Sequence, residues 1–357
     1  MTEYRRVLVD GYPTLTERRG DELIAGDGRR MALNDAIHLA PVEPTKIICI
    51  HLNYRSRVDE FMTKLPAAPT YFHKPITALC GHGADVVRPE GCQWLNYEGE
   101  IAIVIGRTCR NVSPAQAGDY IAGYSVANDY GLHDFRDTDA GSMLRVKGSD
   151  TLCPVGPALV TDWDFRGKRI QTLVNGEVRQ DATTDEMEWD MHYIVADIAR
   201  TITLVPGDIL LSGTPANSRT VYPGDVVSVA VEGLGELTNT IVTGPTPIRD
   251  DVGAQPSDSE EVRSTALGGD WEFRGIRAPL GPGARHYKSA VPSPGAAGAA
   301  ASGDRQGQTA ATGAAATATA ETGGGRDEAA ATGTAATAET GGGRDEAAAT
   351  GTAATEA

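Results

Sequence analysis

Short apolar segments rich in β-branched residues dominate roughly the first 245 residues of this chain. Turn signals separate them, at Asn175-Gly176, Pro206-Gly207-Asp208 and Pro223-Gly224-Asp225. Segments of this length and composition predict strands, and Asn-Gly between two of them predicts a hairpin. We therefore expect a mainly β domain with mostly antiparallel strands and a few short helices, an α+β fold. The segments are Ile47–Ile50, Ile101–Ile105, Ala158–Val160, Gln171–Val174, Ile209–Leu211 and Val226–Val231.

Two stretches predict helices instead. Between Asp190 and Thr201 the apolar residues recur at the spacing of one helical face. Ser113-Pro114 reads as an N-cap followed by proline at the first helical position, with a short helix through Tyr120. The sequence has no glycine-rich phosphate loop and no strand–helix alternation, which disfavours a nucleotide-binding α/β domain.

The composition changes near Pro245, and from about Ala296 the sequence is almost entirely alanine, glycine and threonine. The segment ETGGGRDEAAATGTAAT begins at Glu321 and again at Glu339. Without large apolar residues such a repeat cannot bury enough surface to offset its ordering entropy. We predict a small N-terminal segment (1–45), a catalytic β domain (46–245) and a disordered low-complexity tail (246–357). Deletion beyond Asp250 should then leave turnover intact.

Charge and cysteine usage narrow the possible partners and compartment. A formal net charge of -16 argues against nucleic-acid and anionic-membrane partners but permits an anionic small substrate at a cationic site. The five cysteines lie far apart, as expected for buried thiols in a reducing compartment. The N-terminus lacks the pattern of a signal peptide, and no apolar run is long enough to span a bilayer. We expect a cytoplasmic protein.

Three acidic residues are candidate metal ligands. Glu98 and Glu100 are two apart at the start of a predicted strand, so their side chains leave the same face. Two carboxylates held together repel each other unless a cation lies between them, and oxygen ligands suit Mg²⁺, Mn²⁺ or Ca²⁺. Asp129 follows another predicted strand and can supply a third carboxylate. The alternative is a solvated strand face with no metal.

Two loops carry weaker signals. Lys147 leads into a Gly- and Pro-containing loop that can aim its ammonium group, although most lysines in such positions are surface residues. Thr214 lies in a turn after the strand Ile209–Leu211, where backbone N–H groups can hold a carboxylate. The alternative there is an ordinary turn.

The order of these motifs resembles the fumarylacetoacetate hydrolase family. The resemblance covers about Ile47 to Val242 and implies a mixed β-roll that acts on C–C bonds beside oxo-acid groups, assembled as a homodimer. The motifs are LNY at Leu52–Tyr54, FHKP at Phe72–Pro75, NYEGEIAIVIG at Asn96–Gly106, GYSVANDY at Gly123–Tyr130, KGSDTLCPVGP at Lys147–Pro157, VNGE at Val174–Glu177 and LVPGDILLSGTP at Leu204–Pro215.

The resemblance also assigns residues, position by position. It implies that the metal, Mg²⁺ with Mn²⁺ or Ca²⁺ as alternatives, binds to the three carboxylates of Glu98, Glu100 and Asp129. It implies that Lys147 is catalytic and that Thr214 contacts a substrate carboxylate. Lys74, in the FHKP motif, is assigned to the substrate site together with Thr214.

Two departures from the family pattern bear on the chemistry. Where the family has a histidine that pairs with a glutamate to activate water, this chain has Arg57, with Glu60 retained. Arginine stays protonated and is a poor general base, which weakens the case for hydrolysis. The family's Thr-Ala-Arg-Asp-x-Gln is replaced by Gly131–Arg136, and Arg57 with Arg136 suits a second substrate carboxylate.

We therefore predict a metal-dependent isomerase or decarboxylase acting, through a metal-stabilised enolate, on a small 2-oxo or 2-hydroxy-diene dicarboxylic or tricarboxylic acid. The resemblance is to enzymes of aromatic-acid breakdown that handle 2-hydroxyhepta-2,4-dienedioate and 5-oxopent-3-ene-1,2,5-tricarboxylate. Glu60, His133 and His51 are the candidates for proton transfer. The enzymatic alternatives are an acylpyruvate- or fumarylacetoacetate-type C–C hydrolase and an oxaloacetate decarboxylase. An alternative of another class is a non-catalytic metal-binding relative whose tail recruits partners.

Overall fold

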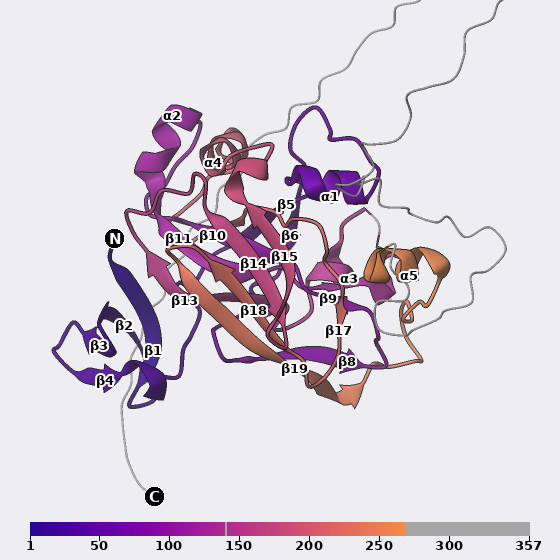
Figure 1. The fold of residues 1–357 in the computed structure, drawn as a ribbon, viewed down its shortest axis with the longest axis horizontal. Coiled ribbons are helices and arrows are strands. Elements are labelled where there is room, and N and C mark those ends of the chain that lie inside the picture. Colours follow the sequence, from indigo (N-terminus) through magenta and orange to yellow (C-terminus); the bar gives the residue numbers. More distant parts are fainter. Residues whose placement is uncertain (140, 269–357) are drawn as a thin grey trace, which may run out of the picture. The chain divides into compact units, whose positions relative to one another are not determined.

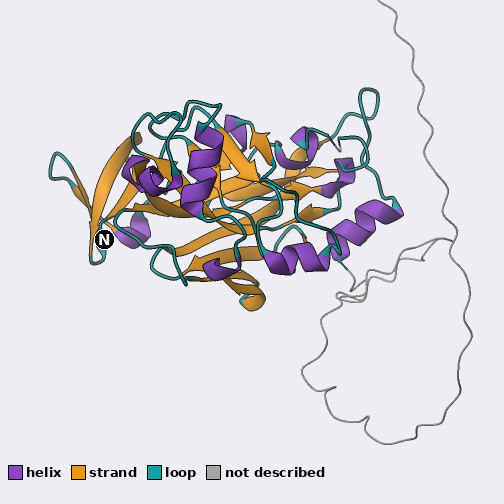
Figure 2. Cartoon of the chain, turned by 90° about the horizontal axis from the view of Figure 1, so that it is seen from above, coloured by secondary structure: helices purple, strands orange, loops and turns teal. Residues whose placement is uncertain are grey.

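The structure, a computed structural model, describes residues 1–139 and 141–268, and they form three β-sheets with short helices around them (Figures 1 and 2). No helix within these ranges is long and apolar enough to cross a membrane. The helices are α1 (Arg55–Glu60), α2 (Pro114–Ala117), α3 (Leu144–Lys147), α4 (Met191–Ala199) and α5 (Glu260–Leu267), with 3-10 turns η1 (Leu33–Asp35), η2 (Ile76–Ala78), η3 (Gly118–Tyr120), η4 (His133–Phe135) and η5 (Thr184–Glu186).

The largest sheet has 11 strands and is mostly antiparallel, in the order β4-β3-β2-β1-β13-β11-β10-β16-β5-β6, with β7 beside β13. Its strands are β1 (Glu3–Val9), β2 (Tyr12–Arg19), β3 (Glu22–Ala25), β4 (Arg30–Ala32), β5 (Ile47–Ile50), β6 (Tyr71–Lys74), β7 (Leu79–Cys80), β10 (Gly99–Ile105), β11 (Ile121–Asn128), β13 (Cys153–Val160) and β16 (Ile209–Leu211). The pairs β5–β16 and β7–β13 are parallel.

Two smaller sheets complete the fold. The five-stranded sheet, in the order β15-β14-β18-β19-β8, comprises β8 (Asp85–Glu90), β14 (Arg169–Val174), β15 (Glu177–Thr183), β18 (Val226–Val231) and β19 (Gly235–Pro247). The three-stranded sheet comprises β9 (Leu95–Asn96), β12 (Gly131–Leu132) and β17 (Thr220–Val221). The predicted mainly β fold with a few short helices is confirmed.

Local sequence explains these elements well. β5, β16 and β18 have the bounds that the apolar segments predict. Asn175 and Gly176 join β14 to β15 with φ angles of 53° and 81°, a left-handed pair that suits the twist of a hairpin. Both predicted helices are present: α4 begins after Asp190, whose carboxylate caps the Tyr193 N–H, and α2 follows Ser113.

The main hydrophobic core lies where the large sheet meets the five-stranded sheet. Ile101 and Ile103 of β10 share it with Ile170 of β14 and Val229 of β18, and α4 covers it with Ile194. All five side chains are fully buried. This packing fixes β10, the strand on which the candidate metal ligands depend.

One of the predicted domain boundaries needs correction. The N-terminal segment (1–45) extends the large sheet, because β1 pairs with β13. The predicted tail begins too early: β19 runs to Pro247, and α5 packs Val262, Ala266 and Leu267 against Trp94. The repeats at Glu321 and Glu339 lie outside the described residues.

Candidate active site

The three predicted metal ligands come together at one end of the β10–β11 pair. Glu98 precedes β10, Glu100 lies within it, and Asp129 directly follows β11. Antiparallel pairing places Gly99 opposite Asn128, whose side-chain oxygen accepts a 2.8 Å hydrogen bond from the Glu98 N–H. One carboxylate oxygen from each ligand residue lies within 4.8 Å of the others, and all three residues are buried.

Two buried lysines bind these carboxylates. The Lys147 ammonium lies 2.6 Å from Glu98 Oε2 and 3.0 Å from Asp129 Oδ2. The Lys74 ammonium lies 2.5 Å from Asp129 Oδ1 and donates to the Tyr130 carbonyl. Glu100 has a different partner, the Gly213 N–H, at 2.8 Å from its Oε2.

This arrangement separates the acidities of the carboxyl groups. Burial, together with the negative charges of Asp129 and Glu98, raises the pKa of Glu100 well above its usual range. The pKa of Asp129 is lowered, because Lys147 and Lys74 outweigh the effect of its burial. The pKa of Lys147 is raised by Asp129 and Glu98 in spite of burial, so its ammonium stays charged.

The donor set fits a hard divalent cation. Three carboxylates lie together, and the two lysines contact Glu98 and Asp129 but not Glu100. Burying a carboxylate without a cationic partner is costly, and a bound cation would remove that cost for Glu100. All three donors are oxygens, which is the ligand type that Mg²⁺, Mn²⁺ and Ca²⁺ take. Glu98, Glu100 and Asp129 would hold such an ion.

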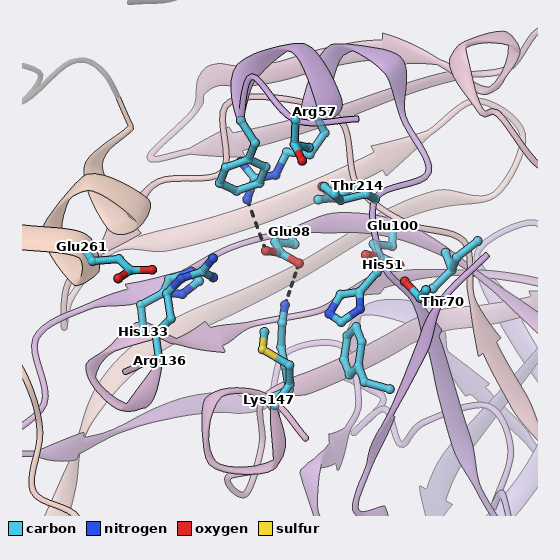
Figure 3. A pocket seen from close by; sticks show the side chains of 16 residues that line it. His51, Arg57, Thr70, Glu98, Glu100, His133, Arg136, Lys147, Thr214 and Glu261 are labelled. Atoms are coloured by element: carbon cyan, nitrogen blue, oxygen red, sulfur yellow. Dashed lines mark hydrogen bonds and ion pairs between the residues drawn. The ribbon is translucent and has the colours of Figure 1, made fainter. Parts of the chain in front are cut away.

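A cavity of about 480 Å³ opens beside Glu98 and Glu100, while Asp129 is buried and does not line it (Figure 3). It is large enough for a small organic acid. It brings together most of the predicted site residues and several that the sequence did not single out. The lining residues are Ile50, His51, Leu52, Arg57, Phe61, Thr63, Thr70, Phe72, Glu98, Glu100, His133, Arg136, Met143, Lys147, Thr214 and Glu261.

Arg57 lines this cavity, and carboxylate groups pair with its guanidinium charge. It lies 2.6 Å from Glu60 and 3.5 Å from Glu98, and it stacks 4.3 Å from the centre of the Phe61 ring. Glu60 also pairs with Arg219, at 2.5 Å. Burial alone would raise the pKa of Glu60, but the two guanidinium groups lower it. Glu60 is thus an ionised anchor for Arg57.

Two of the predicted assignments do not match these positions. Glu60 is not among the residues that line the cavity, and its lowered pKa makes it a poor proton donor. Lys74, predicted to contact substrate, is fully buried and does not line the cavity. Its ammonium holds Asp129 instead, so it positions a ligand residue. Both side chains lie away from the cavity because they bind groups of opposite charge. Glu60 binds Arg57 and Arg219, and Lys74 binds Asp129.

Thr214 lines the cavity, and Gln180 holds its hydroxyl group. The Gln180 amide nitrogen donates to Thr214 Oγ1 at 3.0 Å, and its oxygen accepts from the Gly99 N–H at 3.1 Å and from Thr172. Gln180 therefore ties the loop of Thr214 to the start of β10. No local motif marks Gln180, since its role depends on β15 lying near both segments.

His133 and Arg136 line the cavity from η4 and the residue after it. His133 is 2% exposed, and neither of its ring nitrogens has a hydrogen-bond partner among the described residues. Burial and the positive charges of Arg136, Lys147 and Arg57 lower its pKa well below the usual value, so the ring is neutral at neutral pH. His51, on the other side of Glu98 in Figure 3, has a pKa lowered by burial and Lys147.

Glu261 and Arg219 are the charged site residues that sequence reasoning missed. Glu261 reaches the cavity from α5, in the segment predicted to be a disordered tail. A signal was available, because Ser257-Asp258-Ser259 followed by two glutamates is typical of a helix N-terminus. Arg219 carries no comparable signal, and only the fold reveals its contact with Glu60.

Comparisons with known proteins match the part of the chain that carries Glu98, Glu100 and Asp129. Residues 46–242 match the family described as "Fumarylacetoacetate (FAA) hydrolase C-terminal". Protein Rv2993c of Mycobacterium tuberculosis is 43% identical over 218 residues, which cover 60% of this chain and 82% of that protein. The 4-hydroxyphenylacetate degradation bifunctional isomerase/decarboxylase of Escherichia coli is 36% identical, over 68% of this chain. The chain spans only about half of that enzyme, 56% of its length.

A third relative carries a different activity in its name. The mitochondrial oxaloacetate tautomerase Fahd2a of Rattus norvegicus is 34% identical over 57% of this chain and 69% of that protein.

Solved structures are similar to the same part of the chain. The 2-hydroxyhepta-2,4-diene-1,7-dioate isomerase of Mycobacterium marinum and the 5-carboxymethyl-2-hydroxymuconate delta-isomerase of Mycobacterium smegmatis are each 36% identical, with TM-scores of 0.63 and 0.64. Both cover 69% of this chain and 100% of the solved chain. The maleylpyruvate hydrolase of Sphingobium sp. SYK-6, in complex with manganese(II) and pyruvate, has a TM-score of 0.59 at 26% identity, over 68% of this chain and 99% of its own.

Proposed function

The chain belongs to the fumarylacetoacetate hydrolase family, and on that basis we propose that it is a divalent-metal-dependent isomerase or decarboxylase. Its substrate in this proposal is a small 2-oxo or 2-hydroxy-diene acid with at least one further carboxylate. The names of the Escherichia coli relative and of the two mycobacterial structures support this kind of reaction.

The observation that carries the choice of reaction is the Arg57–Glu60 ion pair at the cavity. The resemblance implies that hydrolases of the family activate water with a histidine at this position, and Arg57 cannot replace it because a guanidinium stays protonated. Its partner Glu60 has a lowered pKa and is held by two guanidinium groups. Reactions that move a proton or release CO2 need no activated water, and they fit these residues better.

A divalent cation bound to Glu98, Glu100 and Asp129 would supply Lewis-acid polarisation of the substrate's carboxylate and 2-oxygen. Residues of the chain hold the ligands, bind the second carboxylate and form the cavity walls. Lys147 pairs with both Glu98 and Asp129 and holds them in place. Arg136 has no ion-pair partner among the described residues and offers its guanidinium to the second carboxylate. Phe61 and Phe72 give the cavity apolar walls.

His133 is the residue best placed to move a proton. As a neutral imidazole it has one N–H and one free lone pair, and both nitrogens lack a partner in the described structure. In isomerisation a proton leaves one carbon, the double bonds shift, and a proton is added at another carbon. In decarboxylation a C–C bond to a carboxylate breaks, CO2 leaves, and the electron pair stays in the conjugated chain until a proton is added.

The test is to incubate the protein with Mg²⁺ and each candidate acid while ultraviolet absorbance and CO2 are followed. We expect tautomer formation or CO2 without cleavage products. In Glu98→Gln and Glu100→Gln we expect turnover to fall at least about 100-fold and calorimetric binding of Mg²⁺ to weaken. Glu177→Gln, on an exposed hairpin, is the matched control. Release of pyruvate plus a second acid, or full activity of the ligand variants, would contradict the proposal.

Oxaloacetate chemistry is a second candidate, favoured by the 34% identity to the rat tautomerase. Oxaloacetate in the same assay, followed as loss of its enol form and as CO2, decides between the two. The predicted homodimer, the identity of the metal, the cytoplasmic location and the place in aromatic-compound breakdown stay predictions.

A further inference from the structure

Helix α5 lies beyond the family match at 46–242, yet it forms part of the cavity wall. Glu261, in its first turn, lines the cavity together with His133 and Arg136 (Figure 3). In that view these three residues lie on one side of Glu98, while His51 and Thr70 lie on the other. A substrate bound at Glu98 that extends toward Arg136 therefore meets Glu261.

Specific contacts hold α5 against this wall. The Ser257 N–H donates to the Asp134 carbonyl of η4 at 2.8 Å, and the Trp94 indole N–H donates to Asp258 at 3.1 Å. At the other end of the helix, the Ala266 carbonyl accepts a 3.0 Å hydrogen bond from the Asn96 side chain. The helix and η4 therefore keep a fixed spacing, and Glu261 has a defined position at the cavity.

Some charged side chains that line the cavity have an ion-pair partner and others do not. Lys147 and Arg57 both have carboxylate partners. Arg136 and Glu261 have none: neither side chain makes an ion pair or hydrogen bond with any residue in the described ranges. One positive and one negative charge thus face the cavity from the same side.

We propose that Glu261 is a specificity-determining residue that favours a 2-oxo acid with one further carboxylate over one with two. This inference rests on the proposed function. The first distal carboxylate binds Arg136. A second one finds no other unpaired cation among the described residues that line the cavity, and it lies in the field of the Glu261 carboxylate. The chain would then act on the dicarboxylic substrate, by proton transfer, in preference to decarboxylating a tricarboxylic acid.

Unreactive analogues test this directly by calorimetry with the full chain and Mg²⁺. The probes are 2-oxoheptanedioate and its 5-carboxy derivative, which differ by one carboxylate. The wild type should bind the dicarboxylic acid more tightly. Because Glu261 is exposed, its charge has a modest effect, so Glu261→Gln should narrow the ratio of the two dissociation constants by about two- to fivefold. Glu261→Lys should narrow it further, and high salt should diminish both effects.

Glu260→Gln is the matched control, since Glu260 shares the first helical turn but does not line the cavity. It should leave the ratio unchanged. An unchanged ratio in Glu261→Gln, or equal weakening of both acids, would overturn the inference and leave Glu261 a structural residue. If the wild type binds neither acid, the proposed function fails and this inference fails with it.

Discussion

At the scale of single residues, the site depends on the balance between three buried carboxylates and two buried ammonium groups. Lys147 touches two of the three ligand residues, while Lys74 touches only Asp129. Both lysines lower the pKa of Asp129, and each also competes with any cation that approaches the carboxylates it contacts. These opposing effects make the consequence of removing one lysine predictable.

Lys147→Met should bind a divalent cation more tightly than the wild type and yet turn over more slowly. The substitution keeps the side-chain volume and removes one positive charge next to Glu98 and Asp129. We expect at least about tenfold tighter binding of Mg²⁺ or Mn²⁺ by calorimetry, because the net charge of the ligand set becomes more negative. Without metal the variant should lose about 3 kcal/mol of stability, since Glu98 and Asp129 lose the cation they share and keep only Arg57 and Lys74.

Lys168→Met is the control for that experiment, because Lys168 makes only a long, partly exposed ion pair with Glu232. It should change neither metal binding nor stability measurably. Weaker metal binding by Lys147→Met would show that the ammonium orients the ligands more than it competes with the cation.

How much of the site could be predicted depends on how local each signal is. Glu100 lies in a strand and Glu98 and Asp129 lie next to strands, so strand geometry places them correctly once the strands are recognised. Motif position predicts roles for Glu60 and Lys74, but long-range ion pairs decide where their charged ends lie. A sequence does not show which opposite charge will be nearest after folding.

At the scale of elements, the strands and α4 were predictable because their signals are periodic and bounded by turn residues. The four strands of the N-terminal segment and helix α5 were not. Helix α5 is hard to predict because an alanine-rich segment follows it and because its apolar face is small. That face consists of Val262, Ala266 and Leu267. That face is stable because it packs on Trp94, a contact far away in sequence.

Helix α5 makes truncation at Asp250 harmful, whereas the sequence alone predicts that turnover stays intact. A chain ending at Asp250 should be less stable and less active than a chain ending at Gly268. Loss of α5 exposes Trp94 and leaves the side chains of Asn96 and Thr220 without the Ala266 carbonyl. We expect a loss of at least about 1 kcal/mol, or roughly 2–4 °C in Tm, and a lower kcat/KM because Ser257 no longer fixes η4.

Thermal unfolding and steady-state kinetics on both truncated chains check this. The chain ending at Gly268 is the control, because it keeps every described element. Equal melting temperatures and equal kcat/KM for the two would mean that α5 contributes nothing to the fold or the cavity.

At the scale of the whole molecule, the candidate site depends on segments that are distant in sequence meeting at the centre of the large sheet. β10 lies between β11 and β16, and β16 pairs in parallel with β5. Asp208, directly before β16, fixes this junction: its carboxylate accepts from Thr45 Oγ1 and the Val205 N–H, each at 2.7 Å, and lies 2.6 Å from the Lys46 ammonium. The side chain of Asp208 is fully buried.

This junction gives the fold a defined acid sensitivity. Burial would raise the pKa of Asp208, but Lys46, the Val205 N–H and Thr45 together lower it. A group with a lowered folded-state pKa stabilises the fold above its unfolded pKa, about 3.9 for aspartate, and loses that contribution as the pH falls through the folded-state value. Asp208→Asn should therefore cost about 1.5–3 kcal/mol at pH 7, and the cost should shrink below about pH 4. Urea unfolding at pH 7 and near pH 3 measures this difference in free energy.

Asp181→Asn is the control, because Asp181 also has a lowered pKa but forms an exposed pair with Arg169. A cost for Asp208→Asn that is the same at both pH values would show that the shape of the side chain, and not its charge, holds β5 and β16 in register.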